Sequence, residues 1–481
     1  VSVIGLIGPV QKQFFPRSDR PEVLVSIYHP QGTSIDVTNQ TAKKVEDLVE
    51  GASGIRSMST FVGAGAPRFF ISANPEQPSS AFAKLVMVAE DVKARDSLIA
   101  LLRSSVADGL FPEARIRVET LLYGPPVDWP VSIRVLGPEA NELRALARRV
   151  RDVISDHPNT ENSHLDWDER TPALNLVFDT DQLRLFGLTP EDVSYQLQFQ
   201  LSGLTLTTLR DGIRLVPAIG RAQAEDAEQI QDLEIVSKDG RRISFNQIGE
   251  VDVVYEEPVI RRYNRELFIS VNADVRGAQA KDVTADVWAN LSDLRERLPA
   301  GYSLQIGGAV EQSAKGEESI QVLQPLMIVL MLIFVMLQMR SFRGTFVVLL
   351  TAPLGLIGAV AAMLMFSQPF GFVATLGIIG LAGILMRNTL ILTQQVSDNV
   401  SSGMQIRNAV IEAGVQRSRP VVLTALAAVL AFIPLTVDSF WGPLAYVLIG
   451  GVSLGTVATL IFVPALYAML YRIPSQSRRD T

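Results

Sequence analysis

Five long apolar stretches in the last third of the chain constrain its fold more than any other feature. They cover residues 320–339, 345–366, 371–396, 420–437 and 441–471, and each is long enough to cross a bilayer as a helix. Glycines recur in these stretches at helical spacing, which in lipid allows helix backbones to approach closely. The sequence therefore predicts a bundle of five membrane helices that follows a charged region of soluble character.

Basic residues predict how this bundle is oriented. The segments after the first and third stretches, together with the C-terminal tail, are rich in arginine, whereas residues 367–370 and 438–440 contain no Lys or Arg. By the positive-inside rule, the C-terminus is expected to be cytoplasmic and residues 11–319 to lie outside the inner membrane. The arginines on the expected cytoplasmic side are Arg340, Arg343, Arg407, Arg417, Arg419, Arg472, Arg478 and Arg479.

The soluble region repeats a pattern of strand, amphipathic helix and strand. Four such units predict two split β-α-β subdomains, each a small sheet covered by helices on one face, and so an α+β membrane protein. The expected strands are 22–28, 84–89, 114–120, 131–136, 267–272 and 302–306, and the expected helices are 34–50, 94–106, 139–155 and 280–298.

Residues 173–258 interrupt this pattern with short strands at 204–209, 213–219 and 233–236 and a helix that starts at Thr189. Such an insertion either presents a surface to another chain or simply extends the fold. The loop at 60–67 lacks the lysine and hydroxyl residue of a phosphate-binding loop. It is expected to be a flexible loop flanked by phenylalanine, or an ordinary connection between strands.

Composition excludes several classes of function. The chain has 481 residues, a net charge of −7, no cysteine and three histidines. These features give no support to nucleic-acid binding, to a thiolate metal site or to a recognisable catalytic arrangement. The sequence therefore predicts neither an enzyme nor a resident metal or cofactor.

Arg387 is a charge near the middle of the third apolar stretch. A charge at that depth costs about 3 kcal/mol even on lenient scales, so it should face protein or water and have an acidic partner. The side chain would have to reach about 15 Å along the helix to escape to the cytoplasmic side. None of the five stretches contains Asp or Glu, so the partner is expected from a part of the protein that this chain lacks.

Several membrane motifs resemble one known family, the resistance-nodulation-division transporters, and within it the exporters of hydrophobic and amphiphilic molecules. The similar segments are 383–392, 417–424, 440–443 and 462–467. The resemblance covers essentially the whole chain but corresponds to the C-terminal half of a transporter. It implies that Arg387 and Asn388 are the basic-Asn pair of the proton relay, to which Arg417 and Thr424 also contribute. Gln394 departs from the family, which often has an acid near this position.

The resemblance also implies a division into domains and a substrate loop. Residues 61–66 would match a glycine-rich switch loop between substrate pockets, with Phe61, Gly63, Gly65, Phe69 and Phe70 as its contact residues. The implied domains are a membrane-helix remnant at 1–15, a first porter subdomain at 16–127, a second at 128–172 and 259–318, a docking domain at 173–258, five membrane helices at 319–473 and a cytoplasmic tail at 474–481.

The implied function is that of a proton-driven antiporter subunit that exports drugs or other amphiphiles through a tripartite complex. The implied partners are the missing N-terminal half, two further copies in a homotrimer, a periplasmic adaptor protein and an outer-membrane channel. The implied energy source is the proton-motive force, and no cofactor is implied. A metal-exporting branch is disfavoured because its matching helix lacks the basic-Asn pair. The alternative is a split or truncated half-transporter that acts as an assembly or binding module without transport.

Overall fold

The computed structural model describes residues 10, 13, 15, 16, 18–167, 169–221 and 233–471. The chain divides into two compact units, one formed by Val1–Asp168 with Ile260–Thr481 and the other by Glu169–Val259. The membrane-helix remnant expected at 1–15 lies outside the described residues except for positions 10, 13 and 15. The cytoplasmic tail expected at 474–481 lies outside them entirely.

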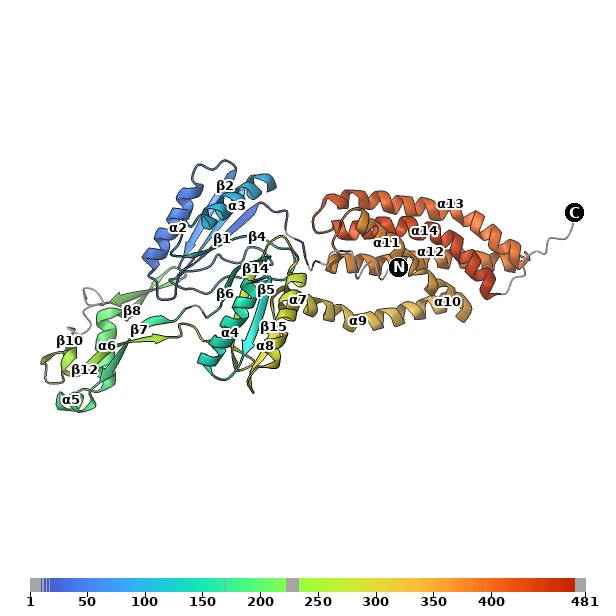
Figure 1. The fold of residues 1–481 in the computed structure, drawn as a ribbon. Coiled ribbons are helices and arrows are strands. Elements are labelled where there is room, and N and C mark those ends of the chain that lie inside the picture. The colour runs from blue at the N-terminus through green and yellow to red at the C-terminus, as the bar shows by residue number, and fades with distance from the viewer. Residues whose placement is uncertain are drawn as a thin grey trace. The chain divides into compact units, whose positions relative to one another are not determined.

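The first subdomain is an antiparallel sheet in the order β2-β3-β1-β4, with helices α2 and α3 packed on it (Figure 1). Alternating residues of the strands, such as Val25 and Leu85, meet the helices in a buried core. Both helices begin at a side-chain cap, and at α3 the Asp91 carboxylate accepts from the backbone N–H of Ala94 at 2.7 Å. The elements are β1 (Glu22–Tyr28), α2 (Ile35–Val49), β2 (Ile55–Val62), β3 (Phe82–Ala89), α3 (Val92–Ala107) and β4 (Arg115–Thr120).

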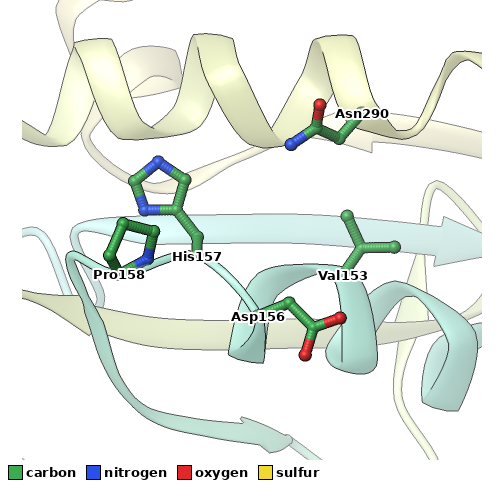
Figure 2. Close-up of a pocket in the computed structure, with 5 residues that line it drawn as sticks. All are labelled: Val153, Asp156, His157, Pro158 and Asn290. Carbon is green, nitrogen blue, oxygen red and sulfur yellow. The ribbon is translucent and has the colours of Figure 1, made fainter.

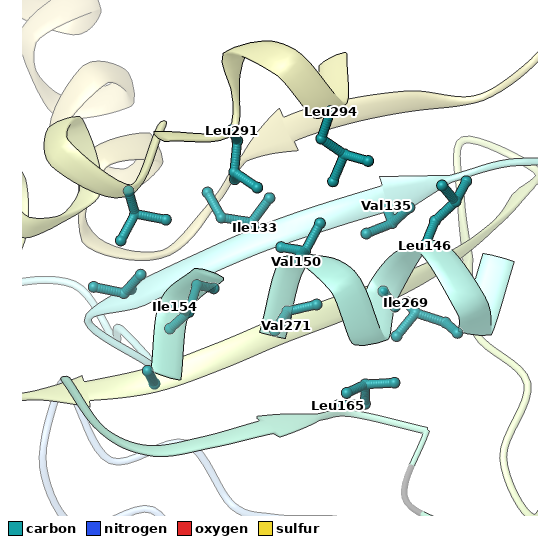
Figure 3. Close-up of a cluster of buried hydrophobic side chains, with 14 of the residues drawn as sticks. Ile133, Val135, Leu146, Val150, Ile154, Leu165, Ile269, Val271, Leu291 and Leu294 are labelled. Atoms are coloured by element: carbon teal, nitrogen blue, oxygen red, sulfur yellow. The ribbon is translucent and has the colours of Figure 1, made fainter. Parts of the chain in front are cut away.

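The second subdomain has a sheet in the order β13-β14-β5-β15, and β6 pairs with β14. Helices α4 and α7 cover its core (Figure 3), in which Ile133, Val150 and Val271 are fully buried. The apolar stripe of α4 gives that helix one buried face, which explains why it packs on the sheet. The elements are β5 (Val131–Leu136), α4 (Ala140–Ser155), β6 (Thr160–Leu165), β13 (Arg262–Tyr263), β14 (Glu266–Val275), α7 (Ala280–Asn290), α8 (Ser292–Glu296) and β15 (Ser303–Ile306).

The inserted unit, Glu169–Val259, has a core of its own in which Leu183, Val193 and Phe245 are buried. Its helix α6 starts at Thr189 with a capping box completed by Asp192. The elements are β7 (Thr171–Phe178), α5 (Thr180–Leu185), α6 (Pro190–Leu201), β8 (Leu204–Asp211), β9 (Arg214–Gly220), β10 (Glu234–Val236), β11 (Arg242–Ser244), the 3₁₀ helix η2 (Phe245–Gln247) and β12 (Gly249–Glu256).

Five candidate membrane spans follow in the described part of the chain, at Gly308–Met339, Phe342–Met365, Phe372–Ser401, Ile406–Val437 and Gly442–Leu470. All five are long and apolar enough to cross a bilayer. Their elements are α9 (Gly308–Met339), α10 (Phe342–Thr351), α11 (Leu354–Met365), α12 (Phe372–Ser401), α13 (Ile406–Phe432), the 3₁₀ helix η3 (Ile433–Val437) and α14 (Gly442–Leu470).

Glycines bring three of these helices into close contact. A Cβ atom on Gly358 of α11 would lie 2.1 Å from the carbonyl oxygen of Gly450 in α14. A Cβ on Gly451 would lie 2.1 Å from Leu381 Cδ2, and one on Gly455 would lie 2.9 Å from Leu385 Cδ2. Gly451 and Gly455 therefore serve the close packing that the sequence predicts for them.

The membrane helices differ from the predicted stretches mainly at their ends. Helix α13 begins at Ile406 rather than at residue 420, so Arg407, Arg417 and Arg419 lie in a helix and not in a loop. Apolar length marks only the part of a helix that suits lipid, whereas the backbone hydrogen bonds continue through the polar turns. The second span is divided between Thr351 and Leu354, where Pro353 cannot donate a helical hydrogen bond.

In the soluble region the sequence predictions miss β2, β6, β7, β11, β12 and β13. Polar side chains alternate with apolar ones only weakly in these strands, and most of their residues are partly exposed. The helix expected at 280–298 is divided into α7 and α8 at Leu291.

Candidate functional site

Helix α12 places Arg387 at its middle, about 22 Å from its first residue by helical rise. The Arg387 side chain is exposed on the surface of the bundle. It makes no hydrogen bond or ion pair with any residue that the structure describes. The cation therefore faces away from the packed interior of these five spans.

The surface around Arg387 is open along one face of α12. Gly380 and Gly383 precede Arg387 by seven and four residues, so all three lie on the same side of the helix. A Cβ atom on either glycine would meet nothing within 4 Å among the described residues. This face therefore has room for the backbone of another helix beside the arginine.

The opposite side of α12 is packed and polar. Asn388 is only 4% exposed, and Thr389 and Thr351 are fully buried. The Thr389 Oγ1 lies 2.9 Å from Thr351 Oγ1, and Thr351 in turn donates to the carbonyl of Val348 at 2.6 Å. Arg387 and Asn388 are neighbours in sequence, but the helix directs the first outward and the second inward. This separation is a consequence of the 100° turn per residue.

Arg417 lies in a different polar contact. Its Nε donates to Gln395 Oε1 at 2.9 Å, and Gln395 Nε2 donates to Asn399 Oδ1, also at 2.9 Å. Gln395 follows Arg387 by eight residues, about 12 Å along α12. The described contacts therefore do not bring Arg417 and Arg387 together.

Thr424 is exposed, and its hydroxyl donates to the carbonyl of Val421 at 2.9 Å. This is the bond to its own helix that a lone threonine commonly makes. Gln394, which stands where an acid was expected, donates to Asp398 Oδ1 at 3.0 Å. The nearest carboxylate on this helix is thus one turn further along.

The glycine-rich loop begins later than the sequence suggests. Phe61 lies in β2 and pairs with Lys84 of β3, and Gly63 follows with φ at +79°. Two backbone hydrogen bonds of Gly63 close the loop. Its N–H donates to the Phe82 carbonyl at 2.9 Å, and its carbonyl accepts from Ser79 N at 3.0 Å. It is therefore an ordered excursion between two neighbouring strands.

The interior of the loop is held together through Gly65. A Cβ on Gly65 would lie 2.5 Å from the backbone nitrogen of Glu76, so only glycine fits there. Glu76 forms an ion pair with Lys84, whose side chain is 8% exposed. Phe69 is exposed, whereas Phe70 packs 6.4 Å from Tyr123 and 5.0 Å beneath the Arg20 guanidinium.

A buried charged cluster was missed by the sequence predictions. Arg117 binds Asp274 with two nitrogens, at 2.8 and 3.0 Å, and Glu119 at 2.8 Å. The guanidinium also lies 3.7 Å above the Trp129 ring. Removal from water raises the pKa of Glu119 although Arg117 opposes that change. The alternation of charged and apolar residues over 115–119 is the signal that could have revealed this face.

A surface pocket of about 290 Å³ lies between the end of α4 and α7 (Figure 2). His157 in this pocket accepts from Asn159 N at 3.2 Å, and its Nε2 lies 3.7 Å from Asp286 Oδ2. None of the predicted site residues lines it. The residues that the structure describes contain no group of three His, Cys, Asp or Glu side chains arranged to hold a metal ion.

Relatives of the chain are known over nearly its whole length. The nickel and cobalt resistance protein CnrA of Cupriavidus metallidurans is 25% identical over 98% of this chain and 45% of its own length. The cobalt-zinc-cadmium resistance protein CzcA of the same organism is 23% identical over 98% of this chain and 46% of its own length. The swarming motility protein SwrC of Bacillus subtilis is 25% identical over 70% of this chain and 33% of its own length. The chain thus spans about half the length of the curated relatives that it matches.

A crystal structure of a heavy metal efflux pump has the same fold, with a TM-score of 0.77, 19% identity and coverage of 98% of this chain and 50% of that one. The expected fold of β-α-β porter subdomains and five apolar helices is therefore confirmed. The expected amphiphile branch finds no support in these names, three of which refer to metals.

Residues 1–471 match the AcrB/AcrD/AcrF family, whose members are transporters rather than enzymes. This match covers nearly all of the chain and includes both porter subdomains, the inserted unit and the five spans. The chain therefore belongs to the AcrB/AcrD/AcrF family of resistance-nodulation-division transporters.

Proposed function

We propose that this chain works as the C-terminal half of a proton-driven exporter of amphiphilic organic molecules. The observation that carries the proposal is Arg387, a cation at the middle of a membrane helix, on an open face and without a partner in the described chain. An unpaired charge at this depth is costly, so a complete bundle must supply an acid to it. The N-terminal half of the transporter is the proposed source of that acid.

Gly380 and Gly383 support this arrangement because they leave space beside Arg387. A second helix that packs on the two glycines would bring a carboxylate on its surface close to the guanidinium. Opposite charges a few ångströms apart attract strongly when water is excluded. Protonation of the carboxylate would remove most of that attraction and allow the two helices to shift.

Asn388 and Thr389 have a supporting role in this proposal. They lie on the packed side of α12, where Thr389 contacts Thr351 of α10. A shift of α12 would therefore be felt by its neighbours rather than absorbed locally. Arg417, through Gln395, would hold the cytoplasmic end of α12 against α13. Thr424 would offer its hydroxyl group to protons that move between the level of Arg387 and that of Arg417.

The porter subdomains favour an organic substrate over a metal ion. Two of their half-buried carboxylates are paired with basic side chains, Glu76 with Lys84 and Asp274 with Arg117. Carboxylates occupied in this way are poor ligands for a divalent cation. Phe61 at the end of β2, with Phe69 and Phe70 of the following loop, instead offers aromatic surface to an amphiphile.

Export of a divalent metal ion is the second candidate, and the names of the relatives favour it. CnrA and CzcA are named for resistance to nickel, cobalt, zinc and cadmium. At 23 to 25% identity the chain shares their family, but individual ligand residues need not be kept. The metal-binding groups would then come from the other half of the transporter or from a neighbouring subunit.

The proposed assembly is a homotrimer that works with a periplasmic adaptor protein and an outer-membrane channel. The proposed orientation places the porter subdomains in the periplasm and the C-terminus in the cytoplasm, as the arginine distribution predicts. A module that only assembles or binds is not favoured, because the relatives above are named for resistance and efflux.

The relay role is tested by replacing Arg387 in the full transporter. We expect Arg387→Ala to abolish efflux of a fluorescent amphiphile, because no cation remains to respond to protonation of the acid. Arg387→Lys should retain part of the activity, since it keeps the charge. Arg419→Ala, which removes an exposed arginine of α13, is the matched control and should pump normally.

Trimer yield after purification must be equal for these variants so that loss of assembly is excluded. Normal efflux by Arg387→Ala would sink the relay role.

The substrate class is tested in cells that produce the full transporter from a plasmid. We expect extrusion of a panel of amphiphilic dyes that stops when a proton uncoupler is added, and unchanged tolerance to nickel, cobalt and zinc. Phe61→Ala and Phe69→Ala should each slow dye extrusion, because they remove aromatic contact surface. Raised metal tolerance without dye extrusion would instead show that the transporter exports divalent metal ions.

A further inference from the structure

Four aromatic rings meet where the first porter subdomain adjoins the membrane helices. Phe15 lies 5.3 Å from Phe372 and 6.1 Å from Phe440 between ring centroids, and Tyr123 lies 5.1 Å from Phe440. These separations fall in the range in which aromatic rings attract one another beyond simple burial. We call Phe15, Tyr123, Phe372 and Phe440 the junction cluster.

Each ring of the junction cluster belongs to a different part of the chain. Phe372 is the first residue of α12, the helix that carries Arg387, and Phe440 lies just before α14. Tyr123 follows β4 of the first porter subdomain, and Phe15 precedes β1. The cluster therefore joins two membrane helices to one end of the β1–β4 strand pair, where the start of β1 lies beside the end of β4.

Backbone hydrogen bonds fasten the segment that carries Phe15 on both sides. Gln13 N donates to the Phe370 carbonyl at 3.0 Å, just before α12. Ser18 N donates to the Leu121 carbonyl at 2.9 Å, just after β4. Gln13 is thus held by the membrane helices and Ser18 by the porter sheet, on either side of Phe15.

Gly124 and the Phe15 ring are in close contact. A Cβ atom on Gly124 would lie 2.4 Å from Phe15 Cδ2, so the ring rests directly on the glycine backbone. Gly124 has φ at +101°, a conformation that only glycine adopts readily. Because close-packed groups transmit displacement rather than absorb it, movement of Phe15 must also move Gly124.

The contacts continue from Tyr123 into the porter subdomain. The Tyr123 hydroxyl donates to Asp19, and this hydrogen bond lowers the pKa of the Asp19 carboxyl. The Tyr123 ring also lies 6.4 Å from Phe70 of the glycine-rich loop. A contiguous series of contacts thus runs from Phe372 at the start of α12 to the loop at residues 63–81.

We propose that the junction cluster is the mechanical link between the helix that carries Arg387 and the first porter subdomain. Displacement of the first turn of α12 moves Phe372, which pushes Phe15 and Phe440 against Gly124 and Tyr123. The porter sheet and the loop that contacts Tyr123 move in turn. The inference rests on the proposed function, because it takes the Arg387 relay as the source of the displacement.

The test uses the full transporter and compares Phe440→Ala and Gly124→Ala with a matched control. Phe366→Ala is that control, because the Phe366 ring lies 4.8 Å from the Tyr446 ring within the bundle and outside the junction cluster. We expect the two junction variants to lower the rate of dye efflux on the order of tenfold, within the usual range for coupling between sites. The control should pump at the wild-type rate.

A distance measurement separates lost coupling from lost folding. The chain has no cysteine, so spin labels at Lys43→Cys and Arg149→Cys, both exposed, report the separation of the two porter subdomains once cysteines elsewhere are removed. Arg387→Ala should shift that distance when the junction cluster is intact and leave it unchanged in Phe440→Ala. Phe440→Leu, which keeps an apolar side chain, should show an intermediate shift.

The outcomes distinguish the two proposals. If Arg387→Ala stops efflux and shifts the distance equally with and without Phe440, the junction cluster is not the link and only this inference is overturned. If Arg387→Ala pumps normally, the relay itself is refuted and the inference is refuted with it.

Discussion

At the scale of single residues, buried charges tie the two porter subdomains together. Arg117 of β4 reaches Asp274 of β14, and the same guanidinium lies on Trp129. Trp129 in turn contacts His164 edge to face at 4.3 Å. A buried arginine keeps its charge only if partners replace the lost water, and here a carboxylate and an aromatic face do so. We therefore expect the pKa of the neighbouring His164 imidazole to differ from its ordinary value.

His164 gives the prediction at this scale. Burial, with repulsion from Arg115 as the next cause, lowers its pKa from 6.5 to about 4. Below pH 6.5 the unfolded chain gains a proton on this imidazole that the folded chain does not. The stability that His164 contributes is thus present above pH 6.5 and is lost as the pH falls towards 4.

Hydrogen exchange of β6 and β14 in the full transporter, expressed as protection factors, measures this loss. Protection should fall between pH 6.5 and 4.5 in the wild type and change less in His164→Gln, which has no titrating group. An equal fall in both proteins would contradict the assignment.

At the scale of elements, glycine decides which membrane helices touch and which surfaces stay open. Gly358 of α11 meets the backbone of Gly450 in α14, whereas Gly380 of α12 meets nothing within 4 Å in the described chain. Both are glycines inside apolar helices, and the sequence around them gives no sign of this difference. Only the way in which the helices cross determines that Gly358 packs against another helix and that Gly380 lies on an open face.

The two glycines lead to opposite expectations. Gly358→Ala should force α11 and α14 apart and cost about 1–3 kcal/mol, the usual cost of overpacking. Gly380→Ala should leave the five helices of this chain intact and weaken the packing of the other half of the transporter beside Arg387.

The thermal midpoint of the purified trimer measures the first effect. Cross-linking between the halves, in a transporter produced as two chains, measures the second. Similar losses of midpoint in both variants would mean that the open face of α12 is not where the other half packs.

At the scale of the whole molecule, the inserted unit and the rest of the chain have separate cores. Phe245 is fully buried in the core of the inserted unit, with Ile235 and Ile248 beside it. The porter cores are built from other residues, such as Ile133 and Leu85. Damage to one core should therefore remain local.

Phe245→Ala is the corresponding prediction. Loss of a buried phenylalanine costs about 3–5 kcal/mol, which is a large part of the stability of a unit of this size. Exchange of backbone amides should rise within residues 169–259 and stay unchanged in the porter sheets. Mass spectrometry of peptides from the full transporter measures both regions at once, and a rise throughout the chain would refute independent cores.

Much of this organisation follows from local patterns in the sequence. The five apolar stretches, the alternation of strands and helices and the charge at Arg387 depend on residues close together in the chain, so they are predictable without a fold. The ends of the helices were less well predicted. Helix α13 starts fourteen residues before the predicted stretch, because helical hydrogen bonding continues beyond the apolar residues. Strands with partly exposed faces, such as β7 and β12, were missed because their pairing partner lies far away in the chain.

The sequence by itself therefore determined that the chain has five apolar stretches long enough for a membrane bundle, with a cation at Arg387 and no Asp or Glu inside those stretches, since length, polarity and spacing are local properties. The tertiary structure alone decided that Arg387 faces an open surface while Asn388 is packed, and that Glu76 neutralises Lys84. It also decided that Arg117 meets Asp274 across 157 residues and that four rings join α12 to the porter sheet. These contacts depend on how distant segments cross and pair, and no local pattern records that geometry.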